Sequence, residues 1–436
     1  MIYNESKFNT EWDTLPLSKL GEFKRGKSKH RPRNDQKLFE GGKYPLIQTG
    51  EIKAANLLIK KHNAAYNEEG LKQSKMWPAG TLAITIAANI AETGILSYPM
   101  CFPDSCVGFI ANKEKTSELF MHYVFTYIKR SIQNSAVGSI QDNINIEMLT
   151  ALNFKIPKKP IQDLIVDLLS AIDYKIELNN DINTELENLA KTIFNYWFVQ
   201  FDFPNEEGKP YKTSGGEMEW NDELKKEIPK GWKAVLLKDK LEFDRGVEPG
   251  SNKYFETPNE EVLIPFYKVG SMDGNADVWI EKEVANGAIC KEDDILLSLD
   301  GSVGRIAIGL NGAYSSGIRK VYQKEGYFPK SYIYFLLHSQ EIQQTIKKNA
   351  TGSNILHAAK ALDYMIAPYN ENIVRKYNGV SKPIFEKILL IKRENQELIK
   401  LRDFLLPLLM NGQVKVKSEA IEQLSMAAEQ QVKYGK

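Results

Sequence analysis

Two long stretches of the sequence place apolar residues alternately three and four positions apart, the pattern of a helix that buries one face against another helix. The first stretch opens at Pro160 and the second at Pro383. The residues expected to pair the helices are Ile165, Leu168, Ile172, Asn179, Ile182 and Leu186 in the first and Ile384, Ile388, Ile391, Asn395, Leu398 and Leu405 in the second. The pattern predicts two coiled-coil helices.

Each apolar face is interrupted near its middle by an asparagine, Asn179 in the first helix and Asn395 in the second. A polar residue at such a position costs stability but fixes register and orientation. The central placement of both favours an antiparallel pair in which the two asparagines face each other. The alternative is that each helix packs only on its own neighbouring domain.

The rest of the chain contains one pattern twice, displaced by 220 positions (232 minus 12). The matching residues are Trp12, Leu17, Glu22, Phe23, Arg25 and Gly26 in the first copy and Trp232, Leu237, Glu242, Phe243, Arg245 and Gly246 in the second. Short β-branched runs separated by Gly, Pro and Asn indicate a twisted sheet with helices beside it in each copy. The predicted fold class is α+β: two similar α/β domains separated by two long helices, which form an antiparallel coiled coil with pseudo-twofold symmetry.

These patterns predict the domain boundaries. The first copy occupies residues 1–157, the first helix 158–199, the second copy 232–378 and the second helix 379–413. Residues 200–231 are rich in Pro, Gly and charge and are expected to form an ordered linker, while residues 414–436 are expected to be a tail.

Length and composition narrow the class of protein. A chain of 436 residues exceeds what one hydrophobic core usually organises. No stretch approaches the roughly 18 apolar residues of a membrane span, and the N-terminus MIYNESKFNTEW has no apolar signal core, so we expect a cytoplasmic protein. Cys101, Cys106 and Cys290 form neither a CxxC pair nor a cluster with histidines, which predicts reduced structural thiols and no metal site.

The charge distribution is more informative than the net charge of +1. Positive residues crowd the segment FKRGKSKHRPRNDQK, which Gly26 and Pro32 keep from being helical. One interpretation is a loop that contacts phosphates, and the other is a merely solvated loop.

Residues Gly21 to Ser28 match G-x-x-x-x-G-K-S, the phosphate-binding loop of nucleotidases. That loop needs a helix directly after it, and KHRPRNDQK cannot begin one there. The second copy keeps Arg245 and Gly246 but has Val247-Glu248 where the motif requires Lys-Ser. We therefore interpret the shared residues as a structural turn.

No catalytic residues are predicted. A base methyltransferase would need a glycine-rich cofactor turn and an Asn/Asp-Pro-Pro-aromatic loop, and the nearest match, Phe203-Pro204-Asn205, lacks the doubled proline. A nuclease would need clustered carboxylates for Mg²⁺, and Glu51-Ile52-Lys53 has no acidic partner on a preceding strand.

The stretch from Pro160 to Trp232, with WFVQFDFPNEEGKPYKTSGGEM and then EIPKGW, closely resembles the central region of type I restriction–modification DNA-specificity subunits. The resemblance extends over essentially the whole chain. It implies that each copy is a target-recognition domain reading one half of a bipartite DNA sequence, and that the two helices set the spacing and dock the modification subunits.

The resemblance also implies a non-catalytic subunit without a cofactor of its own. The expected partners are double-stranded DNA, two modification (methyltransferase) subunits that carry S-adenosylmethionine, and a restriction subunit that uses ATP and Mg²⁺.

Candidate DNA contacts follow from side-chain chemistry, because Arg and Lys neutralise phosphates and amide side chains read adenine. In the first copy they are Lys24, Arg25, Lys27, Lys29, Arg31, Arg33, Gln48, Lys53, Ser139, Gln141 and Asn143. In the second copy they are Arg245, Lys268, Ser302, Arg305, Ser353, Asn354, His357 and Lys360. The glycines beside them are also compatible with plain turns, and Asn143 with a helix cap.

Two other functions remain open. One is the specificity subunit of a related system whose methylase and nuclease are fused in one chain. The other is a coiled-coil scaffold whose globular ends bind protein and not DNA.

Overall fold

The computed structural model describes residues 2–87, 90–137, 146–257, 259, 261–353 and 356–416. It divides into two compact units, Met1–Leu178 with Gln396–Lys436, and Asn179–Asn395. The division falls within the two longest helices, α5 (Lys159–Phe194) and α9 (Glu371–Met410), so each unit contains a segment of both. None of the helices in these residues is long and apolar enough to cross a membrane.

Unit 1 contains the first copy of the repeat, built on two sheets. One has the order β2-β10-β7-β8-β4, with β2 at Gly21–Arg25, β10 at Cys106–Ala111, β7 at Leu82–Thr85, β8 at Thr93–Leu96 and β4 at Leu58–Ile59. The other has the order β5-β3-β9-β6, with β5 at Ala64–Tyr66, β3 at Tyr44–Leu46, β9 at Met100–Cys101 and β6 at Met76–Trp77. A separate pair joins β1 (Asp13–Pro16) to β11 (Asn153–Ile156).

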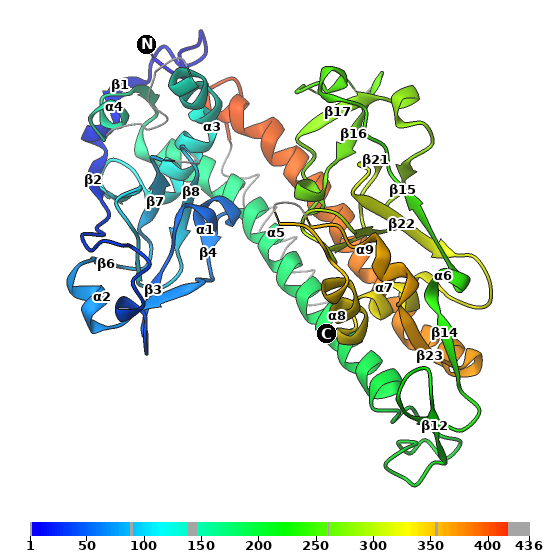
Figure 1. Ribbon diagram of the computed structural model, residues 1–436. Coiled ribbons are helices and arrows are strands. Elements are labelled where there is room, and N and C mark those ends of the chain that lie inside the picture. Colours follow the sequence, from blue (N-terminus) through cyan, green and yellow to red (C-terminus); the bar gives the residue numbers. More distant parts are fainter. Residues whose placement is uncertain are drawn as a thin grey trace. The chain divides into compact units, whose positions relative to one another are not determined.

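The helices of unit 1 are α1 (Thr49–Ala54), α2 (Glu68–Lys72), α3 (Glu118–Val137) and α4 (Ile146–Thr150), with the short turns η1 (Leu17–Lys19) and η2 (Gln36–Leu38). Of these helices, α1, α3 and α4 pack on the first sheet, whereas α2 packs beside β5 of the second. Helix α3 lies beside β7 and β8 (Figure 1), and its Phe120 and Val124 are fully buried in the same core as Leu82 and Phe109. The sheet therefore has an apolar face that α3 closes.

Unit 2 repeats this plan. Its sheets have the orders β15-β22-β19-β20 and β17-β16-β21-β18. The first consists of β15 (Leu241–Arg245), β22 (Ile318–Gln323), β19 (Ile295–Ser298) and β20 (Ile306–Ala307). The second consists of β17 (Val278–Glu281), β16 (Leu263–Tyr267), β21 (Gly312–Tyr314) and β18 (Ile289–Cys290), and β14 (Lys233–Leu236) pairs with β23 (Ile366–Tyr369).

The agreement between the copies extends to strand direction. The pairs β3 with β9 and β16 with β21 are both parallel, while their neighbours in the sheet are antiparallel. The register agrees as well, because Arg25 pairs with Val107 and Arg245 pairs with Arg319 at corresponding ends of the strands. The predicted repeat of an α/β domain is confirmed.

The helices of unit 2 are α6 (Leu237–Lys240), α7 (Lys330–Leu337) and α8 (Gln340–Lys348), with the turns η4 (Ser251–Lys253), η5 (Val269–Ser271), η6 (Lys282–Ala285) and η7 (Ala359–Asp363). Residues 200–231, predicted as a linker, contribute the hairpin of β12 (Met218–Asn221) and β13 (Lys226–Pro229). Its flanking Phe203 stacks on Trp232 with 5.3 Å between ring centroids, so this segment packs into the core of unit 2.

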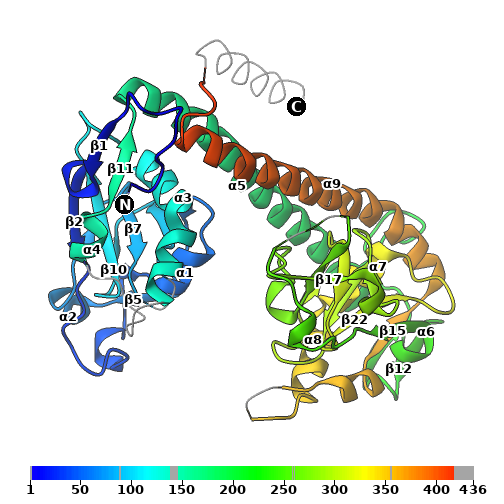
Figure 2. The same cartoon turned by 90° about the horizontal axis from the view of Figure 1, so that it is seen from above.

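Helices α5 and α9 lie side by side and antiparallel (Figure 2). In unit 2, Asn179 donates from Nδ2 to Oδ1 of Asn395 at 2.8 Å, and Tyr377 donates to the carbonyl of Ala190. The Nδ2 of Asn395 donates in turn to Oδ1 of Asn180 at 2.9 Å. The predicted meeting of the two asparagines is confirmed, and their amides satisfy each other in a buried position where an unpaired amide would be costly.

In unit 1 the same two helices are joined by charge. Arg402 on α9 donates to Asp173 on α5 at 2.9 Å, and the Asp173 side chain is only 1% exposed. Tyr123 on α3 and Asn56 also donate to this carboxylate, at 2.7 and 3.2 Å. Burial alone would lower the pKa of Arg402, but Asp173 and Asp403 together raise it above its ordinary value. The Asp173–Arg402 ion pair therefore joins α5 to α9, and its hydrogen bonds from Tyr123 and Asn56 join both helices to the globular part of unit 1.

Two expectations about the helices are wrong. The second helix begins at Glu371 and not near residue 379, so Pro383 lies inside it. An interior proline removes a helical hydrogen bond and costs about 3 kcal/mol, but buried Tyr377 and Phe385 on either side hold this part of α9 in the core of unit 2.

Ile182 is 37% exposed, and Asn183 takes the buried position that the pattern assigned to it. A straight helix drifts by about 20° per heptad from a strict 3.5-residue repeat, so the buried face moves by one residue after Asn179. The other predicted pairing residues are buried or half-buried: Ile165, Leu168, Ile172, Asn179, Leu186, Ile384, Ile388, Ile391, Asn395, Leu398 and Leu405.

A buried histidine makes the stability of unit 1 depend on pH. His122 on α3 bonds Thr93 at 2.9 Å, and burial lowers its pKa to about 4. The unfolded chain binds the proton at a pKa of about 6.5, so this stability is present above pH 6.5 and is lost as the pH falls toward 4. Between pH 7 and 5 the loss is about 2 kcal/mol. We expect His122→Gln to remove that part of the pH dependence in urea unfolding at pH 7 and 5.

The control for this prediction is His62→Gln, at an exposed histidine of the same unit. An equal loss of stability at pH 5 in the wild-type chain and in His122→Gln would contradict the assignment to His122.

Candidate nucleic-acid interface

In unit 2, five loops distant in sequence meet at one edge of the sheets, and they carry most of the predicted contacts of the second copy. Val247 pairs with Ser315, and Asp300 pairs with His357, through isolated β-bridges. The Arg305 guanidinium donates to the carbonyl of Val269 at 2.6 Å. This network brings Arg245, Lys268, Ser302, Arg305 and His357 to the same edge of the domain.

A glycine fixes the start of this edge in both copies. A Cβ atom at Gly246 would lie 2.2 Å from the carbonyl oxygen of Ser315, and one at Gly26 would lie 2.3 Å from that of Pro103. The amide of Gly246 donates to Ile318, and that of Gly26 to Cys106, at corresponding positions of β22 and β10. The repeated Arg-Gly is thus a structural turn, as the sequence predicted.

The Gly21–Ser28 motif does not form a phosphate-binding loop. Its first five residues are strand β2, whose backbone pairs with β10. The next helical turn along the chain, η2, begins only at Gln36.

The structure separates the cations of the basic segment into two groups. Arg33 pairs with Asp104 at 2.6 Å, and Arg31 donates to the carbonyls of Ser28 and His30. Lys24 pairs with Glu22 at 2.6 Å. Arg31 and Arg33 therefore hold the loop in place, which argues against their use as primary phosphate contacts.

Arg25, Lys27 and Lys29 are exposed, and among residues 2–87 and 90–137 their side chains form no ion pair. Lys75 lies beside them, over the ring of Trp77 at 3.5 Å from its centroid. Burial lowers the pKa of Lys75, and the nearby charges of Lys24 and Lys27 lower it further. These residues, Arg25, Lys27, Lys29 and Lys75, form what we call the basic edge of unit 1.

The remaining candidates of the first copy have mixed outcomes. Gln48 and Lys53 are exposed at the two ends of α1, and the backbone amide of Gln48 donates to Glu51 at 3.0 Å. Ser139, Gln141 and Asn143 lie outside the described residues, as does Asn354 of the second copy.

In the second copy, some candidates have structural contacts. Lys268 lies over the ring of Tyr254 at 4.2 Å, and Arg305 is held by Val269. Arg245 is exposed and donates from Nε to the carbonyl of Ser316. Ser302, Ser353 and Lys360 are exposed.

The predicted set omitted three charged residues that the fold places beside Arg245 and His357. Asp300, Glu248 and Arg319 line an open cavity of about 530 Å³ together with them. The sequence offered little signal for these residues. Asp300 stands in a run that predicts a strand and a glycine turn, and Arg319 lies in β22, 74 positions after Arg245 (319 minus 245).

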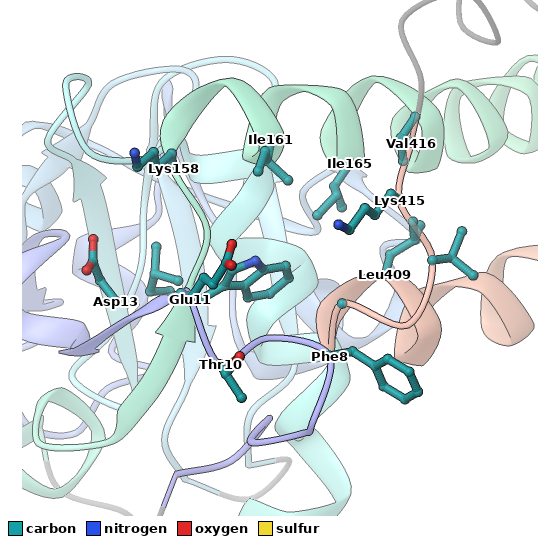
Figure 3. A pocket seen from close by; sticks show the side chains of 14 residues that line it. Phe8, Thr10, Glu11, Asp13, Lys158, Ile161, Ile165, Leu409, Lys415 and Val416 are labelled. Carbon is teal, nitrogen blue, oxygen red and sulfur yellow. The ribbon is translucent and has the colours of Figure 1, made fainter.

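Another cavity in unit 1, of about 540 Å³, is lined by different segments (Figure 3). Ile161 and Ile165 of α5, Leu409 of α9 and the N-terminal Phe8 and Thr10 border it. None of its lining residues belongs to the predicted DNA contacts, so we do not include it in the interface.

The three cysteines have no visible chemical role. Cys101, Cys106 and Cys290 are buried and not in disulfides. Burial raises the pKa of Cys106 and of Cys290 to about 12, which keeps both as inert thiols.

The family model described as "type I restriction modification DNA specificity domain" matches residues 9–188 and again residues 229–361. The two matches fall on the two copies of the repeat.

Three known proteins are similar to this chain. The type I restriction enzyme MjaIX specificity subunit of Methanocaldococcus jannaschii is 26% identical over 94% of this chain and 95% of its own. The HindI specificity subunit of Haemophilus influenzae is 25% identical over 62% of this chain and 71% of its own. The solved S subunit of a type I system from M. genitalium covers 94% of this chain and 99% of its own, with 16% identity and a TM-score of 0.49. Since the family model matches more than half of the chain, the chain belongs to the family of type I restriction–modification DNA-specificity subunits.

Proposed function

We propose that this chain reads a bipartite DNA sequence for a type I restriction–modification complex, each α/β domain reading one half. The observation that carries this proposal is the separate family match on each copy of the repeat. Each copy also gathers polar and positively charged loops at a corresponding edge, beside Arg25 in one and Arg245 in the other. Positive side chains there would position the duplex, and polar ones would read base edges.

The chain is a non-catalytic subunit, and it acts with DNA and other subunits of its system. DNA methylation and cleavage then require partner subunits in the cytoplasm. We propose two modification subunits that bind S-adenosylmethionine and a restriction subunit that uses ATP and Mg²⁺. In this proposal the chain itself holds no cofactor.

The long helices serve two roles in the proposal. Both are continuous, over Lys159–Phe194 and Glu371–Met410, which suits a rigid spacer between two half-sites. Helix α5 also exposes apolar side chains at four-residue spacing, with Tyr174, Leu178 and Ile182 exposed by 45%, 52% and 37%. Such a stripe on one helix face is suited to docking the modification subunits.

The first test is whether methyl transfer requires the modification subunits as well as this chain. The purified chain alone should transfer no methyl group from S-adenosylmethionine to DNA, and adding its modification subunits should give transfer at adenines within one bipartite motif. The measurement is incorporation of labelled methyl groups, followed by sequencing of the modified adenines. Methyl transfer by the isolated chain, or transfer without a defined motif by the complex, would overturn the proposal.

The basic edge of unit 1 gives the second test. Replacing Arg25, Lys27 and Lys29 with Ala should weaken DNA binding by the assembled complex and make it less dependent on salt. Each lost phosphate contact should reduce the slope of log K against log salt by about 0.9. The matched control replaces three lysines at the opposite end of this strand pair: Lys19, which precedes β2, and Lys113 and Lys115, which follow β10. The same slope for both triple variants would show that the edge is only solvated surface.

The helices give a third test. Adding one heptad to α5 after Asn180 and one to α9 before Glu394 keeps the Asn179–Asn395 pairing and lengthens both helices by about 10 Å, or roughly three base pairs. The methylated motif should keep both half-sequences and gain a longer spacer. Adding two residues to each helix at the same sites should misalign the apolar faces and impair assembly. An active double-heptad variant with an unchanged spacer would show that the helices do not set the spacing.

A further inference from the structure

The open cavity of unit 2 combines hydrogen-bond donors and acceptors in a way that suits one base pair. Its charged lining consists of Arg245, Glu248, Asp300, Arg319 and His357. A site that only neutralised phosphates would be lined by cations alone. Two carboxylates beside the arginines would repel a phosphate, so this lining favours the edges of bases.

The carboxylates are held in place by neighbouring side chains. Asp300 accepts a hydrogen bond at Oδ1 from His357 at 2.7 Å, and its side chain is 21% exposed. Glu248 accepts from Tyr254 at Oε1 and from Ser316 at Oε2, both at 3.1 Å. Glu248 thus uses both oxygens within the protein. Among the described residues, the Oδ2 of Asp300 has no hydrogen-bond partner, so it can accept one from outside.

The two arginines also differ in how many of their hydrogen-bond donors are used within the protein. Arg319 is only 7% exposed and donates to the carbonyls of Ser316 and Ile318, which fixes its guanidinium in the lining. Arg245 is exposed and uses Nε toward Ser316. The terminal nitrogens of Arg245 form no hydrogen bond or ion pair within the described part of the chain. The outward-facing chemistry therefore includes an arginine donor beside a carboxylate acceptor, with the exposed ring of His357 next to them.

We propose that Asp300 is a specificity-determining residue that accepts a hydrogen bond from the N4 amino group of a cytosine, while Arg245 donates to the guanine paired with it. In the major groove a G·C pair presents two acceptors on guanine and one donor on cytosine. An arginine beside a carboxylate is the matching arrangement. This inference rests on the proposed function, because it requires that the domain reads DNA.

The first copy lacks this chemistry at corresponding positions. Val107 stands opposite Arg25 where Arg319 stands opposite Arg245. On the next strand of each sheet, Ile84 pairs with Val107 and Leu297 pairs with Arg319, so Ile84 corresponds to Leu297. Three residues further on, Ala87 therefore corresponds to Asp300. Ser28 corresponds likewise to Glu248. The proposed G·C recognition therefore belongs to the half-site of the second domain only.

The test compares the methylated motif of the assembled complex carrying the wild-type chain or Asp300→Ala. The wild-type motif should contain a G·C pair, in the half read by the second domain, that becomes degenerate in the variant. Binding to oligonucleotides substituted at that pair should show discrimination reduced roughly tenfold or more. The other half-sequence should be unchanged, which also shows that the variant complex has folded and assembled.

Two further variants sharpen the comparison. Asp300→Asn keeps the size of the side chain and a neutral acceptor. If the complex with Asp300→Ala is inactive, Asp300→Asn serves as the test, and it should weaken the preference at the same G·C pair. Asp239→Ala is the matched control, since this exposed carboxylate on α6 precedes the opposite end of strand β15. It should leave the whole motif unchanged.

The failures of the two proposals are distinguishable. A wild-type complex without any defined motif would overturn the proposed function. A wild-type motif that Asp300→Ala and Asp300→Asn both leave intact, or that loses an A·T pair in place of a G·C pair, would overturn this inference alone.

Discussion

The close approach of one glycine to a neighbouring strand is the constraint on which each recognition edge depends. Gly26 and Gly246 lie where a Cβ atom would meet carbonyl oxygens at 2.2 to 2.4 Å, so no other residue fits without moving the backbone. Because of this contact, the strand before the glycine ends at a fixed point with its arginine at the domain edge. The loops after it can then vary in chemistry, as Lys27-Ser28 and Val247-Glu248 do, without changing the sheet. A recognition protein needs this separation of a fixed scaffold from variable loops.

The long helices meet a different requirement, that of a unique register. Apolar side chains alone would allow two helices to slide past each other by a turn. The buried Asn179–Asn395 pair in unit 2 and the Asp173–Arg402 pair in unit 1 are each satisfied only in the observed register. Breaking a buried ion pair by removing one partner typically costs 3–5 kcal/mol, whereas the intact pair adds little net stability. These polar contacts are therefore better understood as specifying the alignment than as strengthening it.

The sequence predicted the features that depend on local pattern. The repeat, the antiparallel helices and the facing asparagines follow from spacing alone, and the structure has all three. The exposure of Ile182 and the continuation of α9 through Pro383 depend on tertiary packing, which moves the buried face and holds the helix beyond its local preference. The same limit applies to the interface. Arg31 and Arg33 were indistinguishable from Arg25 in the sequence, because Asp104, which lies 3.6 Å from Arg31 and 2.6 Å from Arg33, comes about 70 residues further along the chain.

Under the proposed function, the differences between the two copies would let an internally repeated protein read a target whose halves differ. A repeat that kept its edge chemistry would present the same donors and acceptors twice. Here the first four strands of each sheet agree in order and direction, whereas Ala87, Val107 and Ser28 of one copy correspond to Asp300, Arg319 and Glu248 of the other. The Val107–Arg319 difference lies on the paired strands β10 and β22, and the other two lie just after strands end. Charged groups introduced at such positions alter which base edges can be satisfied, since a carboxylate or guanidinium without a partner at the interface is costly. Under this proposal, selectivity in each half would come as much from rejecting wrong bases as from binding the right one.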